Sequence, residues 1–449
     1  MSRLTAPNAS RRAIAGWLMF DWAAQPFFTL VTTFVYAPYF ASAIAPDPVA
    51  GQAWWGFAAG AAGLIIAIFS PLLGAIADAG GRRKPGIAAF GALLVVGSAL
   101  LWFGKPGDGV LLVLAAFVIA TIGAEFATVF NNGMMATLVP AHRLGRLSGA
   151  GWAVGYVGGL VSLVLTLGFL AANPQTGKTL LGLTPLFGLD PAAREGDRAA
   201  GPLTALWFVV FVLPLFLFTP DPPGRMGLRD AAKRGLAALT DTLRRLPQER
   251  NVALFLLANM IYADGLVALF AFGGIYAAGT FGWGTIEVGV FGILLTITGT
   301  IGAFVGGTLD DRFGPKRVVL GSLSILIATA LAILSISRDT VGFVIPVTPP
   351  GGGLYAGTAE RVYVALGLLI GIAAGPLQAA SRTLLVRLAP EERVTQFFGL
   401  FALSGRVTSF AGPFLVGIVT VAAASQKAGM AVLVVFFAAG AVLLSRVRA

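Results

Sequence analysis

The sequence contains no cysteine and only one histidine, His142, in 449 residues. Disulfides, iron–sulfur clusters and cysteine-ligated zinc are therefore excluded, and a single histidine cannot form a multi-histidine metal site. Charge is also scarce: Asp, Glu, Lys and Arg make up 11% of the residues, whereas a soluble domain carries about a quarter. A surface with so few charges cannot face water throughout, which indicates that much of it faces lipid.

Hydrophobic residues make up 57% of the chain, and they occur in runs long enough to cross a bilayer. About 20 apolar residues span a hydrocarbon layer roughly 30 Å thick. The first run continues to about Phe40 without a convincing cleavage site, so we interpret it as a membrane helix and not as a signal peptide. We predict an all-α membrane protein with twelve spans, near residues 14–43, 53–77, 85–103, 110–138, 146–171, 202–219, 251–279, 285–309, 317–337, 361–388, 396–422 and 428–445.

The positions of the basic residues predict the orientation of these spans. With the N-terminus in the cytoplasm, 23 of the 31 Lys and Arg residues fall in cytoplasmic segments and seven fall outside. This bias is typical of membrane topology, so the net charge of +11 does not indicate nucleic acid as a partner. We therefore predict a multi-pass protein of the cell (inner) membrane with both termini in the cytoplasm.

A basic segment, residues 221–250, separates six predicted spans from the other six. We predict an N-terminal bundle (1–220), this cytoplasmic linker and a C-terminal bundle (251–449). Residues 228–246 could form an amphipathic helix at the membrane surface. A basic linker that sets topology is the simpler interpretation.

A short motif occurs twice, after the second and the eighth spans, at residues 74–83 and 307–316. Each copy has Gly, then Asp four residues later, then Gly three residues further, followed by basic residues. Glycine permits close helix packing, and Asp at a helix end can bind a nearby Arg or the N-terminus of another helix. We predict a conformational latch made of Gly74, Asp78, Arg82, Arg83, Gly307, Asp311, Arg312, Gly314 and Lys316.

The paired motif resembles the cytoplasmic signature of the major facilitator superfamily. The first copy departs from that signature, because Ala79 replaces the usual Arg after the acid, which implies a weaker latch in the N-terminal half. Four longer segments are similar to the "unknown major facilitator" branch, which is related to the autophagy vacuole effluxers: FDWAAQPFFTL (20–30), RLGRLSGAGWAVGYVGG (143–159), YADGLVALFAFGGIYAAG (262–279) and GPLQAASRTLLVRLAPEERVTQFFGLFALSGRVTSFAGP (375–413).

The resemblance implies two pseudo-symmetric six-helix bundles and export of small molecules, with amino acids as the suggested substrate class. Duplicated halves with a substrate site near the midplane are common in secondary transporters.

Four charged residues, Asp21, Glu125, Asp264 and Arg406, fall inside predicted spans. Each would cost about 2.5–3.5 kcal/mol at the bilayer centre, so we expect all four to face the protein interior. In the resembled fold, the first, fourth and seventh helices line the central cavity. The acids are then candidates to bind protons or a cationic group, and Arg406 is a candidate to bind a carboxylate; alternatively, Arg406 and one acid form a structural ion pair.

Polar neighbours of these charges are further candidates for the substrate or proton site: Gln25, Asn131, Asn132, Tyr262 and Gln378. Arg382 lies near the inner end of its span, where we interpret it as a side chain that reaches the membrane interface. Gly151, Gly155 and Gly159 favour close helix packing, with sliding between conformations as the alternative.

We predict a secondary active transporter, not an enzyme, that moves a small polar solute by alternating access. No nucleotide-binding motif is present, so we expect no cofactor and a cycle driven by an ion or substrate gradient, with protons favoured over sodium because desolvated carboxylates can titrate. The expected partners are the solute and the lipid bilayer, and we expect a monomer. The alternatives are transport of amphipathic drugs or lysolipids, and a non-transporting sensor or membrane enzyme on the same scaffold.

Overall fold

The computed structural model of the chain describes residues 9–245, 248–283, 285–347, 354–405, 408 and 411–448. Apart from one short hairpin, the regular secondary structure of these residues is helical, which confirms the all-α prediction. Eleven helices of the described part are long and apolar enough to cross a membrane.

In the first half of the chain the helices are α1 (Arg11–Pro26), α2 (Tyr36–Tyr39), α3 (Pro48–Gly80), α4 (Lys84–Leu100), α5 (Val110–Leu138), α6 (Leu144–Leu165), α7 (Glu195–Arg198) and α8 (Ala200–Phe218). In the second half they are α9 (Leu228–Arg245), α10 (Arg250–Phe281), α11 (Thr285–Phe313), α12 (Pro315–Leu334), α13 (Thr358–Leu388), α14 (Val394–Ser404), α15 (Ala411–Ala422) and α16 (Gln426–Ser445). The hairpin consists of antiparallel strands β1 (Thr340–Val341) and β2 (Ile345–Pro346).

Short turns of other helix types adjoin these elements. The π-helical turns are η1 (Phe27–Phe34), η2 (Phe40–Ile44) and η5 (Thr166–Leu170). The 3₁₀ turns are η3 (Leu101–Phe103), η4 (Ala141–Arg143), η6 (Leu186–Gly188) and η7 (Glu391–Arg393).

The chain forms two compact units, and each contains a short segment from the other half of the sequence. The first unit contains the chain up to Pro140, Val154–Leu239 and Glu392–Ala402. The second contains Ala141–Ala153, Thr240–Glu391 and the chain from Leu403 onward. Helix α6 therefore begins in the second unit and ends in the first, and most of α14 belongs to the first unit.

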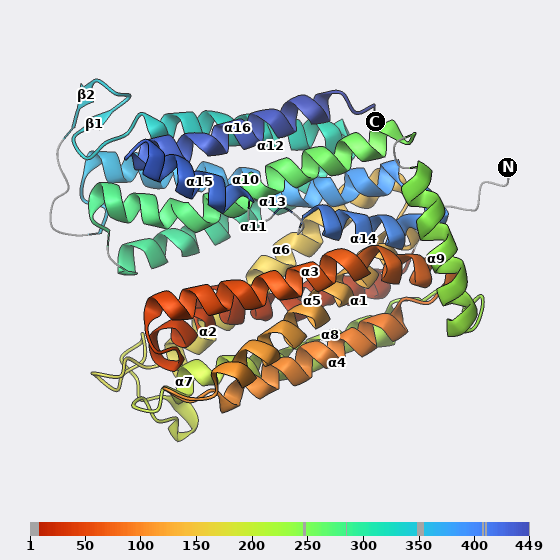
Figure 1. The fold of residues 1–449 in the computed structure, drawn as a ribbon, viewed down its shortest axis with the longest axis horizontal. Coiled ribbons are helices and arrows are strands. Elements are labelled where there is room, and N and C mark those ends of the chain that lie inside the picture. The colour runs from red at the N-terminus through yellow and green to blue at the C-terminus, as the bar shows by residue number, and fades with distance from the viewer. Residues whose placement is uncertain are drawn as a thin grey trace. The chain divides into compact units, whose positions relative to one another are not determined.

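Both units use the same set of helix pairs. In the first unit α1 packs on α8, α3 and α4 pack on α5, and α4 also packs on α8 (Figure 1). In the second unit α10 packs on α16, α11 and α12 pack on α13, and α12 also packs on α16. The order of these helices along the chain is the same in the two halves. This repetition of contacts is the structural counterpart of the duplicated sequence motif.

Proline shapes the first span, which changes from α-helix to π-helix at the end of α1. Pro26 has no N–H group, so it cannot bond the carbonyl of Trp22 four residues earlier. That carbonyl instead accepts a hydrogen bond from Nε1 of Trp207 on α8, at 3.1 Å. The indoles of Trp22 and Trp207 also stack, with 5.7 Å between their centroids. A backbone group released by proline is thus used to join α1 to α8.

The predicted span 396–422 corresponds to α14, which the structure describes from Val394 to Ser404, and α15, which it describes from Ala411 to Ala422. Residues 406–407 and 409–410, between these two helices, lie outside the described residues.

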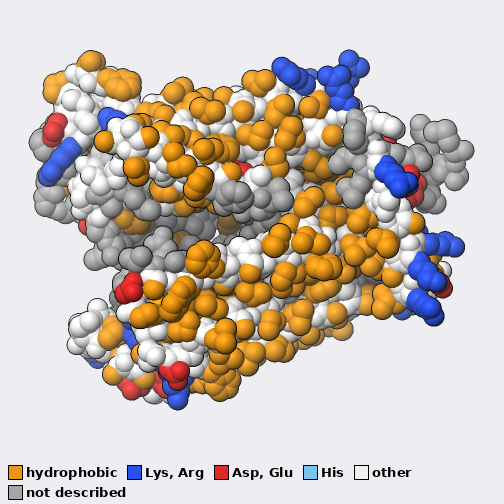
Figure 2. Space-filling model, in the orientation of Figure 1, with side chains coloured by type: hydrophobic (Ala, Val, Ile, Leu, Met, Phe, Trp, Pro, Cys, Tyr) orange, Lys and Arg blue, Asp and Glu red, His pale blue; other side chains and the backbone are white. Residues whose placement is uncertain are grey.

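Large apolar side chains are exposed along the membrane helices, as expected for surfaces that face lipid. Examples are Phe57 on α3, Leu111 on α5 and Phe304 on α11, which are 74%, 81% and 65% exposed. Figure 2 shows hydrophobic side chains along the sides of the helices and Lys and Arg side chains gathered at helix ends. This distribution agrees with a multi-pass membrane protein.

Close packing of α4 on α5 depends on Gly123, because a Cβ atom at this position would lie 2.4 Å from the backbone nitrogen of Leu94. We expect Gly123→Ala to lower the free energy of unfolding by about 1–3 kcal/mol, since the two backbones must separate. Thermal unfolding of the purified protein, followed by tryptophan fluorescence, measures this change. Gly60→Ala is the matched control, because Gly60 is exposed on α3 with no atom within 4 Å of the added Cβ. Equal destabilisation by both substitutions would contradict the packing account.

Candidate functional site

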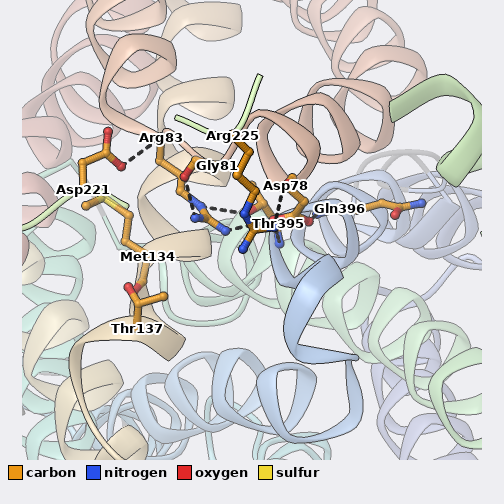
Figure 3. Close-up of polar contacts among 9 residues, drawn as sticks. All are labelled: Asp78, Gly81, Arg83, Met134, Thr137, Asp221, Arg225, Thr395 and Gln396. Atoms are coloured by element: carbon orange, nitrogen blue, oxygen red, sulfur yellow. Dashed lines mark hydrogen bonds and ion pairs between the residues drawn. The ribbon is translucent and has the colours of Figure 1, made fainter. Parts of the chain in front are cut away.

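The carboxylate of Asp78, near the end of α3, binds the first amides of α14 within the first unit. Its Oδ1 accepts a hydrogen bond from the backbone N–H of Thr395 at 3.2 Å, and its Oδ2 accepts one from Gln396 at 2.7 Å (Figure 3). The first amides of a helix have no partner inside the helix and carry a partial positive charge. Asp78 is only 5% exposed, so water does not compete strongly for these bonds.

Arg83 completes this contact from the segment between α3 and α4. Its Nη2 forms an ion pair with Asp78 Oδ1 at 3.0 Å, and its Nε donates to Thr395 Oγ1 at 3.3 Å. Its Nη1 donates to the carbonyl of Gly81 at 2.9 Å. The guanidinium therefore links α3, the turn after it and the start of α14, as Figure 3 shows.

Gly74 permits this approach of α3 and α14. A Cβ atom at Gly74 would lie 2.4 Å from the backbone oxygen of Thr395, closer than nonbonded atoms come. Gly133 on α5 and Gly399 on α14 have equally short distances to Thr395 and to the backbone of Ser70. Three helices thus meet at glycines around the start of α14.

The second copy of the motif makes the corresponding contact in the second unit. Asp311, near the end of α11, accepts hydrogen bonds from the backbone N–H groups of Gly145 at 2.9 Å and Arg146 at 3.3 Å, the first amides of α6. Arg146 Nε also forms an ion pair with Asp311 at 3.3 Å. Gly307 lies against the carbonyl of Gly145, 2.6 Å from the position of an added Cβ.

The turns that follow Asp78 and Asp311 each contain a glycine with a positive φ. The φ values of Gly81 and Gly314 are 85° and 88°, in the left-handed region that favours glycine, so both positions require glycine for the turn that ends the helix. A sequence signal for the two bound helix starts exists as well: Pro140 and Arg143 precede α6 with the same spacing as Pro390 and Arg393 before α14. The latch predicted from the sequence does not include this second repeat.

Two basic residues assigned to the latch lie elsewhere. Arg82 is exposed and lines a depression of about 430 Å³ together with Lys84, Phe216 and Asp221, and it forms no ion pair among the described residues. Arg312 is exposed and lies over the ring of Phe313, with 5.2 Å between guanidinium carbon and ring centroid. The partner of Asp311 is therefore Arg146 and not Arg312.

Lysine residues near the repeated turns bind helix ends in both units. Lys84 Nζ donates to the carbonyl of Phe216 on α8 at 2.8 Å. Lys316 Nζ donates to the carbonyl of Ser445 on α16 at 2.9 Å. Positive charge at the C-terminal end of a helix is favourable, so each lysine stabilises the last helix of its half. Asp221 caps the start of α4, which was not predicted from the sequence. Its carboxylate accepts hydrogen bonds from the backbone N–H groups of Arg83 at 2.9 Å and Lys84 at 3.1 Å.

A further acidic residue that the sequence analysis missed, Asp310, adjoins Asp311. It is 1% exposed, and its Oδ1 lies 3.7 Å from Nη2 of Arg387. The Asp310–Arg387 pair joins α11 to α13 within the second unit.

The interpretation of Arg382 as an interfacial side chain is wrong. Arg382 on α13 is 4% exposed, and it donates from Nε to Ser148 Oγ at 3.1 Å and from Nη2 to the Ser148 carbonyl at 2.7 Å. Its guanidinium carbon lies 5.4 Å from the ring centroid of Trp152. Arg382 therefore joins the N-terminal part of α6 to α13 within the second unit. The position of Arg382 along its predicted span could not reveal this contact, because Ser148 is more than 200 residues away in the sequence.

The intramembrane candidates of the first unit have different degrees of burial. Asn131 is fully buried, and the Trp17 indole donates to its backbone carbonyl at 2.9 Å. Asn132 is 7% exposed, while Asp21, Gln25 and Glu125 are half-buried. Asp21 and Gln25 face the glycines of α6, since an added Cβ at Gly155 would lie 3.5 Å from both side chains. This contact supports the packing interpretation of the glycine repeat.

In the second unit, Asp264 and Tyr262 on α10 are each 2% exposed. The hydroxyl groups of Tyr262 and Ser381 are hydrogen-bonded at 2.7 Å, which joins α10 to α13. Gln378 is half-buried and donates to the carbonyl of Ala374 in its own helix at 3.3 Å. Arg406 lies outside the described residues. The roles of all these residues in binding a solute or protons stay predictions.

Comparison with known proteins agrees with this architecture. The family described as "Vacuole effluxer Atg22 like" matches residues 140–449, and the one described as "Major Facilitator Superfamily" matches residues 4–163. The chain is 24% identical to the uncharacterized MFS-type transporter YxiO of Bacillus subtilis, over 96% of this chain and 93% of that protein. It is 23% identical to autophagy-related protein 22 of Yarrowia lipolytica over 67% of this chain, and the match spans only 50% of that longer protein.

Two solved structures share the fold. The outward conformation of the major facilitator transporter FucP matches with a TM-score of 0.69 and 16% identity, over 98% of both chains. The proton:xylose symporter XylE matches with a TM-score of 0.67 and 15% identity, over 97% of this chain and 94% of that one. At these identities the likeness shows the fold alone.

The two carboxylate caps can be tested independently by hydrogen exchange. We expect Asp78→Asn to speed exchange of the amides of Thr395 and Gln396 by about tenfold or more, because hydrogen bonds to a charged group contribute about 1.5–3 kcal/mol. Asp311→Asn should do the same for Gly145 and Arg146. Mass spectrometry of peptides from the starts of α14 and α6 measures both, and each variant is the control for the other. Uniform acceleration of both peptides in either variant would contradict separate caps.

Proposed function

The chain belongs to the Atg22-like vacuole effluxer family of major facilitator transporters, and from this membership we propose that it exports small polar solutes such as amino acids by alternating access. The family consists of transporters and not of enzymes, so the chain is a multi-pass secondary transporter. The direction and the substrate class are our proposal. They are supported by the family's description as effluxers and by the chemistry of the intramembrane residues.

The proposed transport cycle rests on one observation, the two carboxylates that cap helix starts. Asp78 from the first sequence half binds the start of α14 from the second, and Asp311 from the second half binds the start of α6 from the first. Alternating access in this kind of fold requires two halves to move against each other. Each cap joins residues from both sequence halves, and we propose that these bonds break and re-form in each cycle, as in a latch.

Arg83 and Arg382 strengthen the same two connections. Arg83 binds both Asp78 and Thr395, and Arg382 binds Ser148 on α6. Gly74 lies at the contact of α3 with α14, and Gly307 lies at the contact of α11 with α6. Neither glycine has a side chain that would obstruct separation of the helices. We propose that Gly74, Asp78 and Arg83 form one latch, and that Gly307, Asp311 and Arg146 form the other. Gly81 and Gly314 set the turns, Lys316 secures the last helix, and Arg82 and Arg312 contribute only charge at the membrane surface.

A small zwitterion suits the polar groups within the spans. Carboxylates at Asp21 and Glu125, and amides at Asn131, Asn132, Gln25 and Gln378, can bind an ammonium group or act as neutral donors and acceptors. Such groups are costly in lipid, so their presence in helices is itself a reason to assign them to solute or ion binding. We propose that both termini are cytoplasmic, on the strength of the bias in basic residues, and that export runs outward.

Transport can be measured with purified protein in proteoliposomes. We expect saturable counterflow of at least one labelled amino acid in vesicles loaded with the same unlabelled amino acid. Asp21→Asn and Glu125→Gln should reduce the initial rate by about tenfold or more, because each removes a charged partner worth roughly 1.5–3 kcal/mol. Asp108→Asn is the control, since Asp108 is exposed in a loop and its side chain accepts a hydrogen bond from the neighbouring amide of Gly109.

Other results of the transport measurement would favour the alternative functions. Movement of a lysophospholipid without amino acid counterflow would replace the proposed substrate class by an amphipathic one. Saturable binding of a solute without any flux would indicate a sensor. Full activity of both acid variants would remove Asp21 and Glu125 from the mechanism.

A further inference from the structure

A depression in the surface of the first unit lies where the start of α4 adjoins the end of α8. Its volume is about 430 Å³. Helices α4 and α8 pack on each other, and they belong to the membrane spans Lys84–Phe103 and Glu195–Phe218 (Figure 1). The lining includes Lys84, the first residue of one span, and Phe216, in the last turn of the other. The depression therefore lies at the boundary between membrane and water.

Arg82 lines this depression, and its guanidinium has no acidic partner in the part of the chain that the structure describes. Its neighbour Arg83 is buried in the Asp78 cap, whereas Arg82 is exposed and contributes only charge to the latch. The Arg82 side chain lies along Gly224, since an added Cβ at that glycine would be 3.1 Å from its Nε. A guanidinium carries five N–H donors in a planar fork that fits phosphate and carboxylate groups.

A second cation, Lys84, lines the same depression. Its Nζ donates to the Phe216 carbonyl at 2.8 Å, and an ammonium group has two further donors. Asp221 is also part of the lining, but its two carboxylate oxygens accept hydrogen bonds from the backbone amides of Arg83 and Lys84. Two cations and one anion leave a net charge of +1, which favours an anion with a single negative charge.

The rest of the lining is apolar, which suits a lipid better than a soluble anion. It consists of Pro85, Ala88, Phe216, Pro222 and Pro223. One turn deeper in the membrane, on the same faces of the two helices, Ala92 of α4 is exposed and Leu213 of α8 is 49% exposed. An apolar surface thus continues from the depression along both helices, where the glycerol and the acyl chains of a phospholipid would lie.

We propose that this depression binds the phosphate group of an anionic phospholipid, with Arg82 and Lys84 as its ligands. Basic pockets between membrane helices are a known type of binding site for anionic head groups. The phosphodiester of phosphatidylglycerol carries one negative charge, which matches the net charge of the lining. A zwitterionic lipid would bring its ammonium group close to two cations, so it binds less well. A free phosphate ion would gain nothing from the apolar walls.

The assignment goes beyond the proposed transport function and does not depend on it. None of the residues predicted to bind a solute or protons lines the depression. A lipid bound here would contact the turn between α3 and α4 from the membrane side, and it would leave the solute candidates within the spans unoccupied.

The test is native mass spectrometry of the purified full chain in detergent micelles, titrated with short-chain phosphatidylglycerol, phosphatidylethanolamine and phosphatidylcholine of equal acyl length. We expect a saturable phosphatidylglycerol site for which the two zwitterionic lipids are weaker by about tenfold or more. Arg82→Gln should weaken phosphatidylglycerol binding by about tenfold or more, because charge-assisted hydrogen bonds to the phosphate are lost. Arg312→Gln is the matched control, since Arg312 is an exposed arginine near the second repeated turn and lies over Phe313.

A second pair of variants tests the shape of the site without changing its charge. Ala88→Leu places a larger side chain in the depression and should weaken phosphatidylglycerol binding by about tenfold or more, since overpacking of a filled site is unfavourable. Ala99→Leu is the control, because Ala99 is exposed near the other end of α4. Thermal unfolding checks that all four variants are folded.

Three results would overturn the assignment. The first is equal affinity for phosphatidylglycerol and the two zwitterionic lipids. The second is phosphatidylglycerol binding that Arg82→Gln leaves unchanged. The third is displacement of the lipid by an equal concentration of inorganic phosphate, which would identify a site for a soluble anion.

Discussion

The fold depends on one constraint, that a backbone N–H or C=O group inside a bilayer must find its partner within the protein. Continuous helices meet this requirement except at their ends and at prolines. Many of the polar contacts between helices occur at such an exception. Asp78 and Asp311 bind helix starts, Lys84 and Lys316 bind helix ends, and the Trp207 indole binds the carbonyl that Pro26 releases. Contacts at helix ends therefore hold the helices of each unit together.

The exchange of short segments between the two units follows from the same contacts. Residues Ala141–Ala153 belong to the second unit because Asp311 and Arg382 bind them, although the rest of α6 packs in the first. Glu392–Ala402 belong to the first unit because Asp78 and Arg83 bind them. Charge-assisted hydrogen bonds thus join each of the two helix starts to the unit in which it lies.

The sequence predicted the helices well and the long-range partners poorly, for a physical reason. Whether a segment crosses the membrane depends on its own apolar residues and on the basic residues beside it. These local patterns therefore located the spans on both sides of the repeated motif. The spacing of Gly74, Asp78 and Gly81 against Gly307, Asp311 and Gly314 identified the duplication. The Ser148 partner of Arg382 and the Thr395 partner of Arg83 depend on which helices meet, and no local pattern encodes this. Proline does not mark the ends of the membrane helices either, because Pro71, Pro214 and Pro376 lie inside helices.

The two carboxylate caps differ in one respect, the accessibility of their arginines to dissolved ions. The side chain of Arg83 is 9% exposed and its partner Asp78 is 5% exposed, whereas the side chain of Arg146 is 65% exposed beside Asp311 at 7%. Dissolved ions weaken a solvent-exposed ion pair, and they affect a buried one much less. The two copies of one sequence motif therefore form caps of unequal sensitivity to salt: a change in the concentration of dissolved ions weakens the Asp311 cap and leaves the Asp78 cap almost unchanged.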